Sequence, residues 1–434
     1  MKPLAAPRSS ASLDVTAVRA DFPILGELMN GSPLVYLDSA ATSQKPRAVF
    51  EAEASFLARG NAAVHRGAHT LAAEATELFE EARAAVATFV RAQPDDIVWT
   101  AGATAGINLI AYSIGNASLG RGGKAARRLA PAPGDEIVVT ESEHHANLIP
   151  WQELAARTGA TLRHIPVLDD GRLDLAAAAE LVGPRTRIVA FPHVSNILGI
   201  VNPVPYLVSL ARAVGALTVL DACQSAAHLA LDLPALGVDL AVFSGHKIFA
   251  PYGVGALYGR PDVLEALPPF LTGGSMITAV TLDAAEYLPP PQRFEAGTQP
   301  VSQAIGLAAA VRYLGSLGHD AIAAQEASLE RRLREGLREV PGVRMLGDAE
   351  GVERVAIAAF EVEGVHAHDV GQFLDARGVA VRVGHHCAQP LHRRFGMTAS
   401  VRASAAFYNT EDEVDTFLDA LSGVRAFFGM ERVR

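Results

Sequence analysis

Few side chains in this chain can serve as a nucleophilic amine or thiol. Its 434 residues include four lysines and two cysteines, Cys223 and Cys387. Lys45 lies beside a proline in a polar stretch, and Lys124 lies in a basic stretch. Lys247 instead follows Ser-Gly-His at the end of an apolar run. Lys247 is therefore the amine whose surroundings best suit chemistry.

Asp221 is an acid that can pair with Lys247. It ends the apolar run 217–221, 26 residues before Lys247, so both residues are expected where strands end. A carboxylate and an amine at two strand ends of one sheet can face each other across a flat ligand. Pyridoxal phosphate needs such a pair, because a lysine forms its Schiff base and an acid keeps its ring nitrogen protonated. The alternatives are a helix N-cap for Asp221 and a surface ion pair for Lys247.

A turn of small residues is a candidate phosphate site. Residues 100–108 (TAGATAGIN) follow an apolar run and open a predicted helix. Small residues let backbone amides approach an anion, and a helix N-terminus attracts negative charge. The stretch lacks the Lys-Ser/Thr ending of a nucleotide P-loop, and ordinary packing is the alternative. Ser244 and His246 are further candidate donors to the phosphate.

Histidines gather in two stretches, 143–147 (EHHAN) and 382–390 (RVGHHCAQP). A histidine after the run 136–140 can stack on a cofactor ring and move protons near neutral pH. In the second stretch, imidazoles and an arginine surround Cys387, an environment that lowers a thiol pKa. Cys223 follows a buried run and fits a small apolar core residue. Zinc is the alternative for these histidines with Cys387, although structural zinc sites usually take four ligands in short pairs.

Arg402 lies among small and apolar residues on a predicted strand, 400–404 (SVRAS). A guanidinium there can hold a substrate carboxylate through two hydrogen bonds. A buried structural ion pair is the alternative.

Alternating apolar runs and helical patterns indicate an α/β fold that positions these residues. Near-continuous apolar strands between helices predict a mostly parallel sheet covered on both faces, with ligands at the carboxyl ends of its strands. The predicted strands are 97–100, 136–140, 161–166, 187–193, 217–221, 240–244 and 255–258, with helices at 151–158, 173–181 and 204–214. Residues 121–133 (RGGKAARRLAPAP) are predicted to form a basic surface loop, either solvated or in contact with a partner.

The pattern changes after a run of three prolines, and we predict a second, smaller α+β domain. Its predicted helices are 302–314, 320–340, 368–377 and 410–428, and its strands lie near 355–361 and 379–383. The predicted organisation is an N-terminal segment, 1–30, that packs with the small domain, a large cofactor-binding domain, 31–300, and a small C-terminal domain, 301–434, that carries the Cys387 loop.

Composition excludes several classes of protein. A formal net charge of −10 and a pI near 5.8 argue against nucleic acid as a partner. Two cysteines cannot form a disulfide framework, which suits a reducing compartment. No run approaches the ~20 apolar residues of a membrane span, and residues 1–14 lack the apolar segment of a secretory signal. We therefore expect a cytoplasmic protein without a membrane partner.

In this order, the motifs resemble the SufS-type (group II) cysteine desulfurases and related selenocysteine lyases, in the class V aminotransferase group of pyridoxal-phosphate enzymes of fold type I. The resemblance covers nearly the whole chain after about residue 20. The matching stretches are 36–42 (YLDSAAT), 64–67 (VHRG) with His69 and Thr70, 143–147, 193–196 (HVSN), 221–224 (DACQ), 244–247 (SGHK), 293–298 (RFEAGT) and 384–387 (GHHC). It implies a large domain with a mostly parallel seven-stranded sheet and a smaller α+β domain.

The resemblance implies a role for each matching residue. Lys247 would carry the cofactor as an internal aldimine, and His144 would stack on the ring and assist proton transfer. Cys387 would attack the substrate sulfur. The other cofactor contacts implied are Asp221 to the pyridine nitrogen, Gln224 to the ring hydroxyl, and Thr104, Ser244, His246 and the partner subunit's Thr298 to the phosphate. Asn196 and Arg402 would bind the substrate carboxylate, with Arg382 near the entrance.

The implied reaction converts L-cysteine to L-alanine and leaves a persulfide on Cys387. A homodimer would then pass this sulfur to an acceptor protein of iron-sulfur cluster assembly, and no metal is implied. The alternatives are a selenocysteine lyase, another class V lyase such as an epimerase or a kynureninase-like enzyme, which would not need Cys387, and a non-enzymatic zinc-binding scaffold. The chain departs from the family pattern at Ala105, where an acid is common, at Tyr252, where a threonine is common, and in a longer insertion at 115–133.

Overall fold

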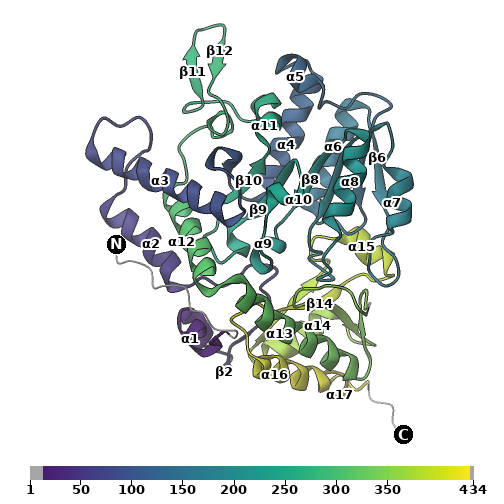
Figure 1. The fold of residues 1–434 in the computed structure, drawn as a ribbon. Helices are drawn as coiled ribbons and strands as arrows, with labels where there is room; N and C mark the ends of the chain where they lie inside the picture. Colours follow the sequence, from purple (N-terminus) through teal and green to yellow (C-terminus); the bar gives the residue numbers. More distant parts are fainter. Residues whose placement is uncertain (1–12, 349, 431–434) are drawn as a thin grey trace.

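The computed structural model describes residues 13–348 and 350–430, and its centre is a seven-stranded sheet (Figure 1). Strand β10 runs antiparallel to both of its neighbours, and the other pairs are parallel, so the prediction of a mostly parallel sheet is confirmed. In spatial order the strands are β4 (Ile97–Thr100), β10 (Gly255–Gly259), β9 (Leu240–Ser244), β8 (Leu217–Asp221), β7 (Thr186–Pro192), β5 (Glu136–Thr140) and β6 (Thr161–Ile165). The connection from β9 to β10 is too short for a crossover helix, which explains the reversal of β10.

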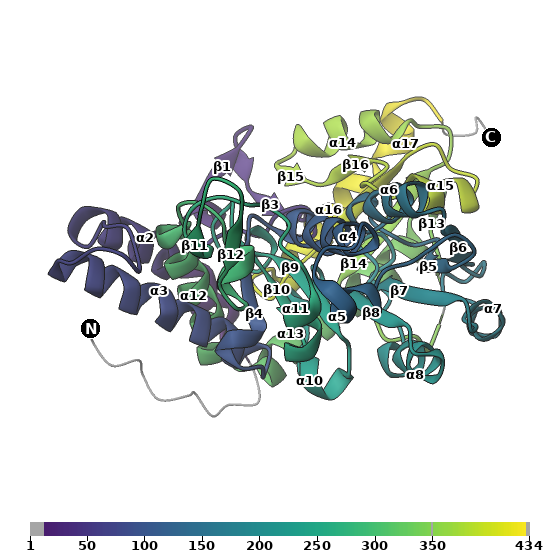
Figure 2. The same ribbon diagram turned by 90° about the horizontal axis from the view of Figure 1, so that it is seen from above.

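Alternate residues of the strands enter two separate cores. Ile137 and Val139 of β5 pack with one set of helices, whereas Val138 between them packs with the other set. The first set is α4 (Ala103–Ser118), α6 (Ile149–Thr158) and α11 (Pro261–Ala266), and the second includes α3 (Thr70–Phe89), α7 (Leu175–Leu181), α8 (Val204–Val214) and α12 (Val301–Leu317). Figure 2 shows α6 and α8 on opposite sides of β5 and β7. Because successive side chains of a strand point to opposite faces, helices cover both faces of the sheet, and the strand ends stay free for a site.

A second, four-stranded antiparallel sheet lies below the first in Figure 1. Its order is β13 (Val343–Met345), β14 (Ile357–Val362), β17 (Ser400–Ser404) and β16 (Arg382–Gly384), and it packs with α13 (His319–Glu339), α14 (Ala367–Asp375) and α16 (Glu411–Ser422). Leu329, Leu333 and Leu337 recur at helical spacing on the face of α13 that enters this core. The predicted final helix 410–428 is wrong in one respect, because α16 ends at Ser422 and a short α17 (Val424–Phe427) follows Gly423.

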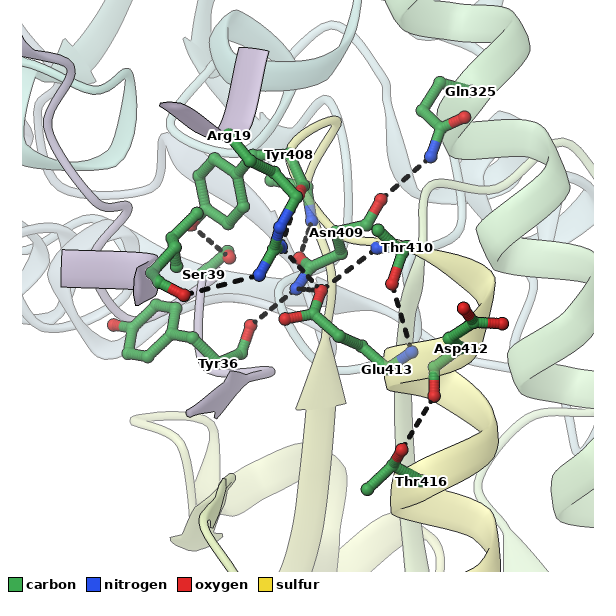
Figure 3. Close-up of polar contacts among 12 residues, drawn as sticks. Arg19, Tyr36, Ser39, Gln325, Tyr408, Asn409, Thr410, Asp412, Glu413 and Thr416 are labelled. Atoms are coloured by element: carbon green, nitrogen blue, oxygen red, sulfur yellow. Dashed lines mark hydrogen bonds and ion pairs between the residues drawn. The ribbon is translucent and has the colours of Figure 1, made fainter. Parts of the chain in front are cut away.

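The described part of the N-terminal segment packs against the C-terminal part of the chain. Arg19, in α1 (Val15–Ala20), donates to the carbonyl oxygen of Tyr408 at 2.8 Å and to Glu413 at 2.9 Å (Figure 3). Further along, β3 (Val35–Tyr36) pairs in parallel with β15 (Val379–Ala380). Residues 1–12, and with them most of the stretch predicted not to be a secretory signal, lie outside the described residues.

The boundaries of the predicted domains stay predictions. Helix α12 begins at Val301, directly after the boundary at 300, yet it packs on α3 and on α2 (Arg47–Arg59). The basic stretch 121–133 is not wholly a loop, since it contains α5 (Gly123–Arg127), although Arg121, Lys124, Arg127 and Arg128 are exposed as expected. No helix within the described ranges is long and apolar enough to span a membrane.

Several short elements complete the chain. A hairpin of β11 (Ile277–Val280) and β12 (Ala285–Tyr287) projects from the body at the top of Figure 1. The remaining elements are the β1 (Leu28–Met29) and β2 (Ser32–Pro33) hairpin, helices α9 (Ser225–His228), α10 (Leu233–Leu236) and α15 (Gln389–Arg394), and 3-10 turns at Pro23–Gly26, Pro94–Asp96, His145–Asn147, Gly245–Lys247 and Gln292–Phe294.

A buried ion pair ties α3 to the segment that leads into α12. The guanidinium of Arg83 donates to both carboxylate oxygens of Glu295, at 2.6 and 2.9 Å, and Glu295 also accepts the backbone N–H of Trp99 at 2.8 Å. The side chains are 1% and 4% exposed. Removing the Glu295 charge leaves the buried Arg83 guanidinium with only the partly exposed Glu80, at 2.8 Å, as its counter-ion, so we expect Glu295→Gln to lower the free energy of unfolding by about 1–3 kcal/mol.

Urea unfolding followed by circular dichroism measures this loss. Arg344→Gln is the matched control, because Arg344 pairs with Glu361 at 2.6 Å where both side chains are exposed. Its effect is expected to stay within about 0.5 kcal/mol. Equal effects of the two substitutions would contradict a structural role for the buried pair.

Candidate active site

A cavity of about 190 Å³ lies at the carboxyl ends of the parallel strands, where residues of both sheets meet. It brings together ten of the twelve predicted site residues. These ten are Thr104, His144, Asn196, Asp221, Ser244, His246, Lys247, Arg382, Cys387 and Arg402. These residues come from a span of nearly 300 positions in the sequence and line one small cavity. The predicted amine, Lys247, and the predicted thiol, Cys387, lie 140 positions apart and both line it.

The other two predicted residues do not line this cavity. Gln224 is buried beside it, and its amide donates to the carbonyl oxygen of Ala40 at 2.9 Å. Thr298 is exposed and lines a second cavity of about 290 Å³, with Trp99 and Ala105 among its neighbours. Their predicted roles stay predictions.

Asp221 and Lys247 lie at the carboxyl ends of neighbouring strands. Asp221 is the last residue of β8, and Lys247 closes a single 3-10 turn directly after β9. Asp221 accepts the backbone N–H of Cys223 at 2.9 Å, which orients the carboxylate at the strand end. Burial, followed by the Asp221 charge, raises the pKa of the Cys223 thiol to about 12. Cys223 is therefore a protonated core residue, as the sequence predicts.

The turn before α4 packs tightly against the end of β9. Gly102 has φ +144°, and a Cβ at this position would lie 3.2 Å from the Ser244 hydroxyl oxygen. That hydroxyl accepts the backbone N–H of Ala103 at 2.8 Å. Helix α4 thus starts at the cavity, with Thr104 exposed in its first turn. Backbone amides, a hydroxyl and the helix N-terminus form the donor set that a phosphate requires.

Two buried polar residues hold the loop that carries His144. Glu143 accepts the Thr140 hydroxyl at 2.7 Å and the Asn147 amide at 2.7 Å, and Asn147 in turn accepts the indole N–H of Trp151 at 2.9 Å. Burial raises the pKa of Glu143 well above its ordinary value, while these hydrogen bonds oppose the shift. In the EHHAN stretch, the first and last residues therefore anchor the loop, and His144 between them lines the cavity.

The imidazoles around the cavity are neutral near pH 7. Burial and the neighbouring Lys247 charge lower the pKa of His144 to about 4, against an opposing effect of Asp221. Burial, with Lys247 and Lys45, likewise lowers the pKa of His246 to about 4. A neutral His144 agrees with its Nδ1 atom accepting the Ala146 N–H at 3.0 Å, and such a ring can take up a proton.

Cys387 lies on a turn between β16 and α15, where it is exposed and reaches the cavity. Asn196 donates to the carbonyl oxygen of His386, at 2.9 Å, directly before the cysteine. The His386 ring is buried against the Ser400 hydroxyl at 3.0 Å, and burial with the Arg402 charge lowers its pKa to about 2. His386 therefore acts as a neutral support for the turn.

Two arginines share one carboxylate at the edge of the cavity. Arg402 donates to the Asn196 carbonyl oxygen at 3.0 Å and to Asp38 at 3.4 Å, and Arg382 lies 3.7 Å from the other Asp38 oxygen. The buried Nε of Arg402 has no hydrogen-bond partner among the described residues. Two positive charges face one negative charge, so the site has a cationic excess that suits a carboxylate ligand.

Sequence reasoning missed Asp38 and Lys45. The ammonium of Lys45 donates to the carbonyl oxygens of Ser43 and, at 3.0 Å, of His246, the residue before Lys247. Burial lowers the Lys45 pKa to about 8. Tyr252, a departure from the family pattern, stacks on the His246 ring with centroids 5.6 Å apart. The only signal in the sequence was the presence of Asp38 and Lys45 in or near a matching motif, 36–42.

The zinc alternative finds no geometric support in the described ranges. Across residues 13–348 and 350–430, no three His, Cys, Asp or Glu side chains converge as metal ligands would. His385, His386 and Cys387 are consecutive in sequence, but His386 turns into the core toward Ser400.

His193, at the end of β7, should make stability depend on pH. Burial lowers its pKa from 6.5 to about 4, and its Nδ1 atom is buried without a partner among the described residues. Between pH 4 and pH 6.5 the unfolded chain binds a proton at this residue that the folded protein does not. The contribution of His193 to the free energy of unfolding therefore rises as pH rises from about 4 to 6.5, and it is constant above that range. We expect the urea midpoint of the wild type to gain more between pH 5 and pH 7 than that of His193→Gln. Equal gains would show that His193 titrates normally in the folded state.

Comparisons with known proteins find relatives over nearly the whole length of the chain. The model of the family described as aminotransferase class-V matches residues 35–417. A probable cysteine desulfurase 2 from Mycobacterium leprae is 53% identical over 98% of this chain and 99% of its own length. A cysteine desulfurase from Dickeya dadantii is 47% identical over 96% of this chain and 98% of its own.

Solved structures give the same relationship. The apo structure of a cysteine desulfurase from Thermococcus onnurineus has a TM-score of 0.88 at 38% identity, covering 96% of this chain and 98% of that one. The cysteine desulfurase CsdA from Escherichia coli has a TM-score of 0.85 at 35% identity, covering 95% and 99%. These likenesses confirm the predicted fold class, and the SufS-type group stays a prediction. Because the family model spans most of the sequence, the chain belongs to the aminotransferase class-V family.

Proposed function

We propose that this protein is a pyridoxal-phosphate-dependent cysteine desulfurase, which converts L-cysteine to L-alanine and retains the sulfur as a persulfide on Cys387. The observation that carries the proposal is the cavity that Lys247 and Cys387 line together with Asp221. A class V lyase of another kind would not need an exposed thiol at this position. Relatives named as cysteine desulfurases, at 47–53% identity, support the same activity.

The residues present fit the cofactor. Lys247 offers the amine and Asp221 the carboxylate, while the turn at α4, Ser244 and His246 offer donors to a phosphate. The buried Nδ1 atom of His246 lacks a partner among the described residues, as expected of a group that awaits a ligand. Gln224 is proposed for the ring hydroxyl, because its amide has a second N–H beyond the one given to Ala40.

The proposed roles of the substrate contacts follow from charge. Arg402 and Asn196 bind the carboxylate of L-cysteine, with the unused Nε of Arg402 as a donor. Arg382 is exposed at the cavity edge and guides the anionic group inward. Asp38 offsets part of this positive charge and holds both guanidinium groups in place.

The chemistry divides between the cofactor and the protein. Bound pyridoxal phosphate supplies an electron sink for the pair left behind when the Cα–H bond breaks. Lys247 and neutral His144 hold and move protons at the substrate. The Cys387 sulfur bonds to the substrate sulfur as the Cβ–S bond breaks, and the electron pair of that bond ends in a C–H bond of alanine. L-Cysteine and the Cys387 thiol thus become alanine and a persulfide, with no external oxidant.

We further propose a homodimer that delivers sulfur to an acceptor protein. Thr298 is exposed in the second cavity, with apolar neighbours that include Phe270 and Leu271. A second copy of the chain bound there would bring Thr298 to the cofactor phosphate held by that second copy. The exposure of Cys387 leaves a persulfide open to the thiol of an acceptor of iron-sulfur cluster assembly. A cytoplasmic location agrees with this role.

Substitution of the amine and the thiol tests the proposal. We expect Lys247→Ala to lose both turnover and the visible absorption of the bound cofactor. Cys387→Ala should keep the absorption and lose persulfide formation, because it lacks only the sulfur acceptor. Alanine and sulfide released from L-cysteine, with the absorption spectrum, are the measurements. Lys124→Ala is the control, because Lys124 is exposed on α5. A Cys387→Ala enzyme that desulfurates normally would contradict the role of the thiol.

Substitution of Arg402 tests the carboxylate site. Arg402→Lys keeps the charge but removes the forked donor geometry, so we expect KM for L-cysteine to rise on the order of 10- to 100-fold. Cysteamine has the thiol and the amine of L-cysteine but no carboxylate. In this variant its KM should exceed that of L-cysteine by much less than it does in the wild type. Steady-state kinetics with both compounds decide the matter, and an unchanged KM for L-cysteine would place the carboxylate elsewhere.

A further inference from the structure

The turn that carries Cys387 has a backbone conformation that side chains disfavour. His386 has φ +49° and Cys387 has φ +57°, so two successive residues other than glycine lie in the left-handed region. Such residues persist only where their surroundings hold them, and they cluster at functional sites. The position of the thiol therefore depends on contacts from other parts of the chain.

His145 supplies two of those contacts. Its backbone N–H donates to the carbonyl oxygen of Cys387 at 2.7 Å, and its ring Nε2 accepts the backbone N–H of Gln389 at 3.1 Å. His145 thus binds the turn at the cysteine itself and again two residues later, where α15 begins. On the other side of the thiol, Asn196 holds the His386 carbonyl oxygen.

The loop that presents His145 is itself anchored. Glu143 and Asn147 fix both ends of the EHHAN stretch in the buried hydrogen-bond chain described above. His144 lines the cavity, whereas His145 does not belong to its lining and faces the Cys387 turn instead. The two neighbouring histidines thereby connect the proton-transfer position and the thiol through a single rigid segment.

We propose that His145 is a positioning residue that holds the Cys387 turn in register with His144 and so determines where the thiol lies in the cavity. This inference rests on the proposed function, because it concerns sulfur transfer to Cys387. The ring must be neutral to accept the Gln389 N–H, and burial, together with nearby His385, lowers the His145 pKa below its ordinary value. The side chain contributes the tether at Gln389, and the backbone contributes the tether at Cys387.

The test compares the holoenzyme with three variants. His145→Ala removes the acceptor for the Gln389 N–H, and His145→Gln replaces it with an amide oxygen. His164→Ala is the matched control, because His164 is exposed on β6, away from the turn. Three quantities are measured: persulfide formed on Cys387 in a single turnover with L-cysteine, the change in cofactor absorption when L-cysteine binds, and hydrogen exchange of the peptide that contains residues 385–391.

We expect His145→Ala to slow persulfide formation roughly 10- to 100-fold, because a small displacement of a reacting atom costs this much, and to speed hydrogen exchange of the turn. The absorption change on L-cysteine binding should persist. His145→Gln should restore both the persulfide rate and the exchange to near the wild-type values, and His164→Ala should leave them unchanged.

A wild-type persulfide rate in His145→Ala would overturn the proposal. So would a slow His145→Gln whose turn exchanges like that of the wild type, because the side chain would then act by another route. If His145→Ala does not fold, the persulfide rate and the hydrogen exchange of His145→Gln together decide between these outcomes. Failure of the wild type to form any persulfide would instead refute the proposed function, and hydrogen exchange would still report whether His145 holds the turn.

Discussion

The docking of the second sheet against the carboxyl edge of the first is the constraint on which this structure depends. Parallel strands present Asp221 and Lys247 at their ends, but the Cys223 thiol beside them is buried and protonated, and both arginines of the cavity come from elsewhere. Arg402 on β17 and Cys387 beyond β16 come from the second sheet. The bond from Arg402 to the Asn196 carbonyl oxygen and the bond from Asn196 to the turn at His386 join the two sheets at the place where they meet. Without this docking, neither half would contain a complete site.

The N-terminal part of the chain completes that junction. Asp38 bridges to Ser404 in β17 and lies between the two arginines of the cavity. The Ser404 hydroxyl accepts the backbone N–H of Ala40 at 3.0 Å, and Ala40 in turn lines the cavity. Residues near the start of the chain therefore lie between the two sheets and contact both of them at the cavity. This arrangement explains why a motif so distant from the lysine and the cysteine belongs to the same site.

Burial determines the charge state of the site. Four buried or half-buried imidazoles, those of His144, His193, His246 and His386, have pKa values of about 2 to 4 because a charge is costly away from water. Neutral rings can accept hydrogen bonds from backbone N–H groups, and they leave the positive charge of the cavity to arginine and lysine. The protein thus separates groups that bind an anion from groups that can accept a proton.

The resemblance to a known family was needed to predict Thr104, Asn196 and Arg382 as residues of the site. Strand and helix periodicity, together with the few amines and thiols, sufficed to predict the seven strands, the ligand edge and the positions of Asp221 and Lys247. These features follow from local chemistry, because apolar runs form buried strands and the residues after them must lie at the strand ends. The break of the last helix at Gly423 and the short helix within 121–133 depend on small local preferences that periodicity does not resolve. Only the tertiary structure placed Asp38 between two arginines, Lys45 on the carbonyl oxygen of His246, His145 on the Cys387 turn and Thr298 in a separate cavity. The physical reason is that these contacts join segments far apart in the sequence, and the packing of whole sheets, rather than any local pattern, decides which distant side chains meet.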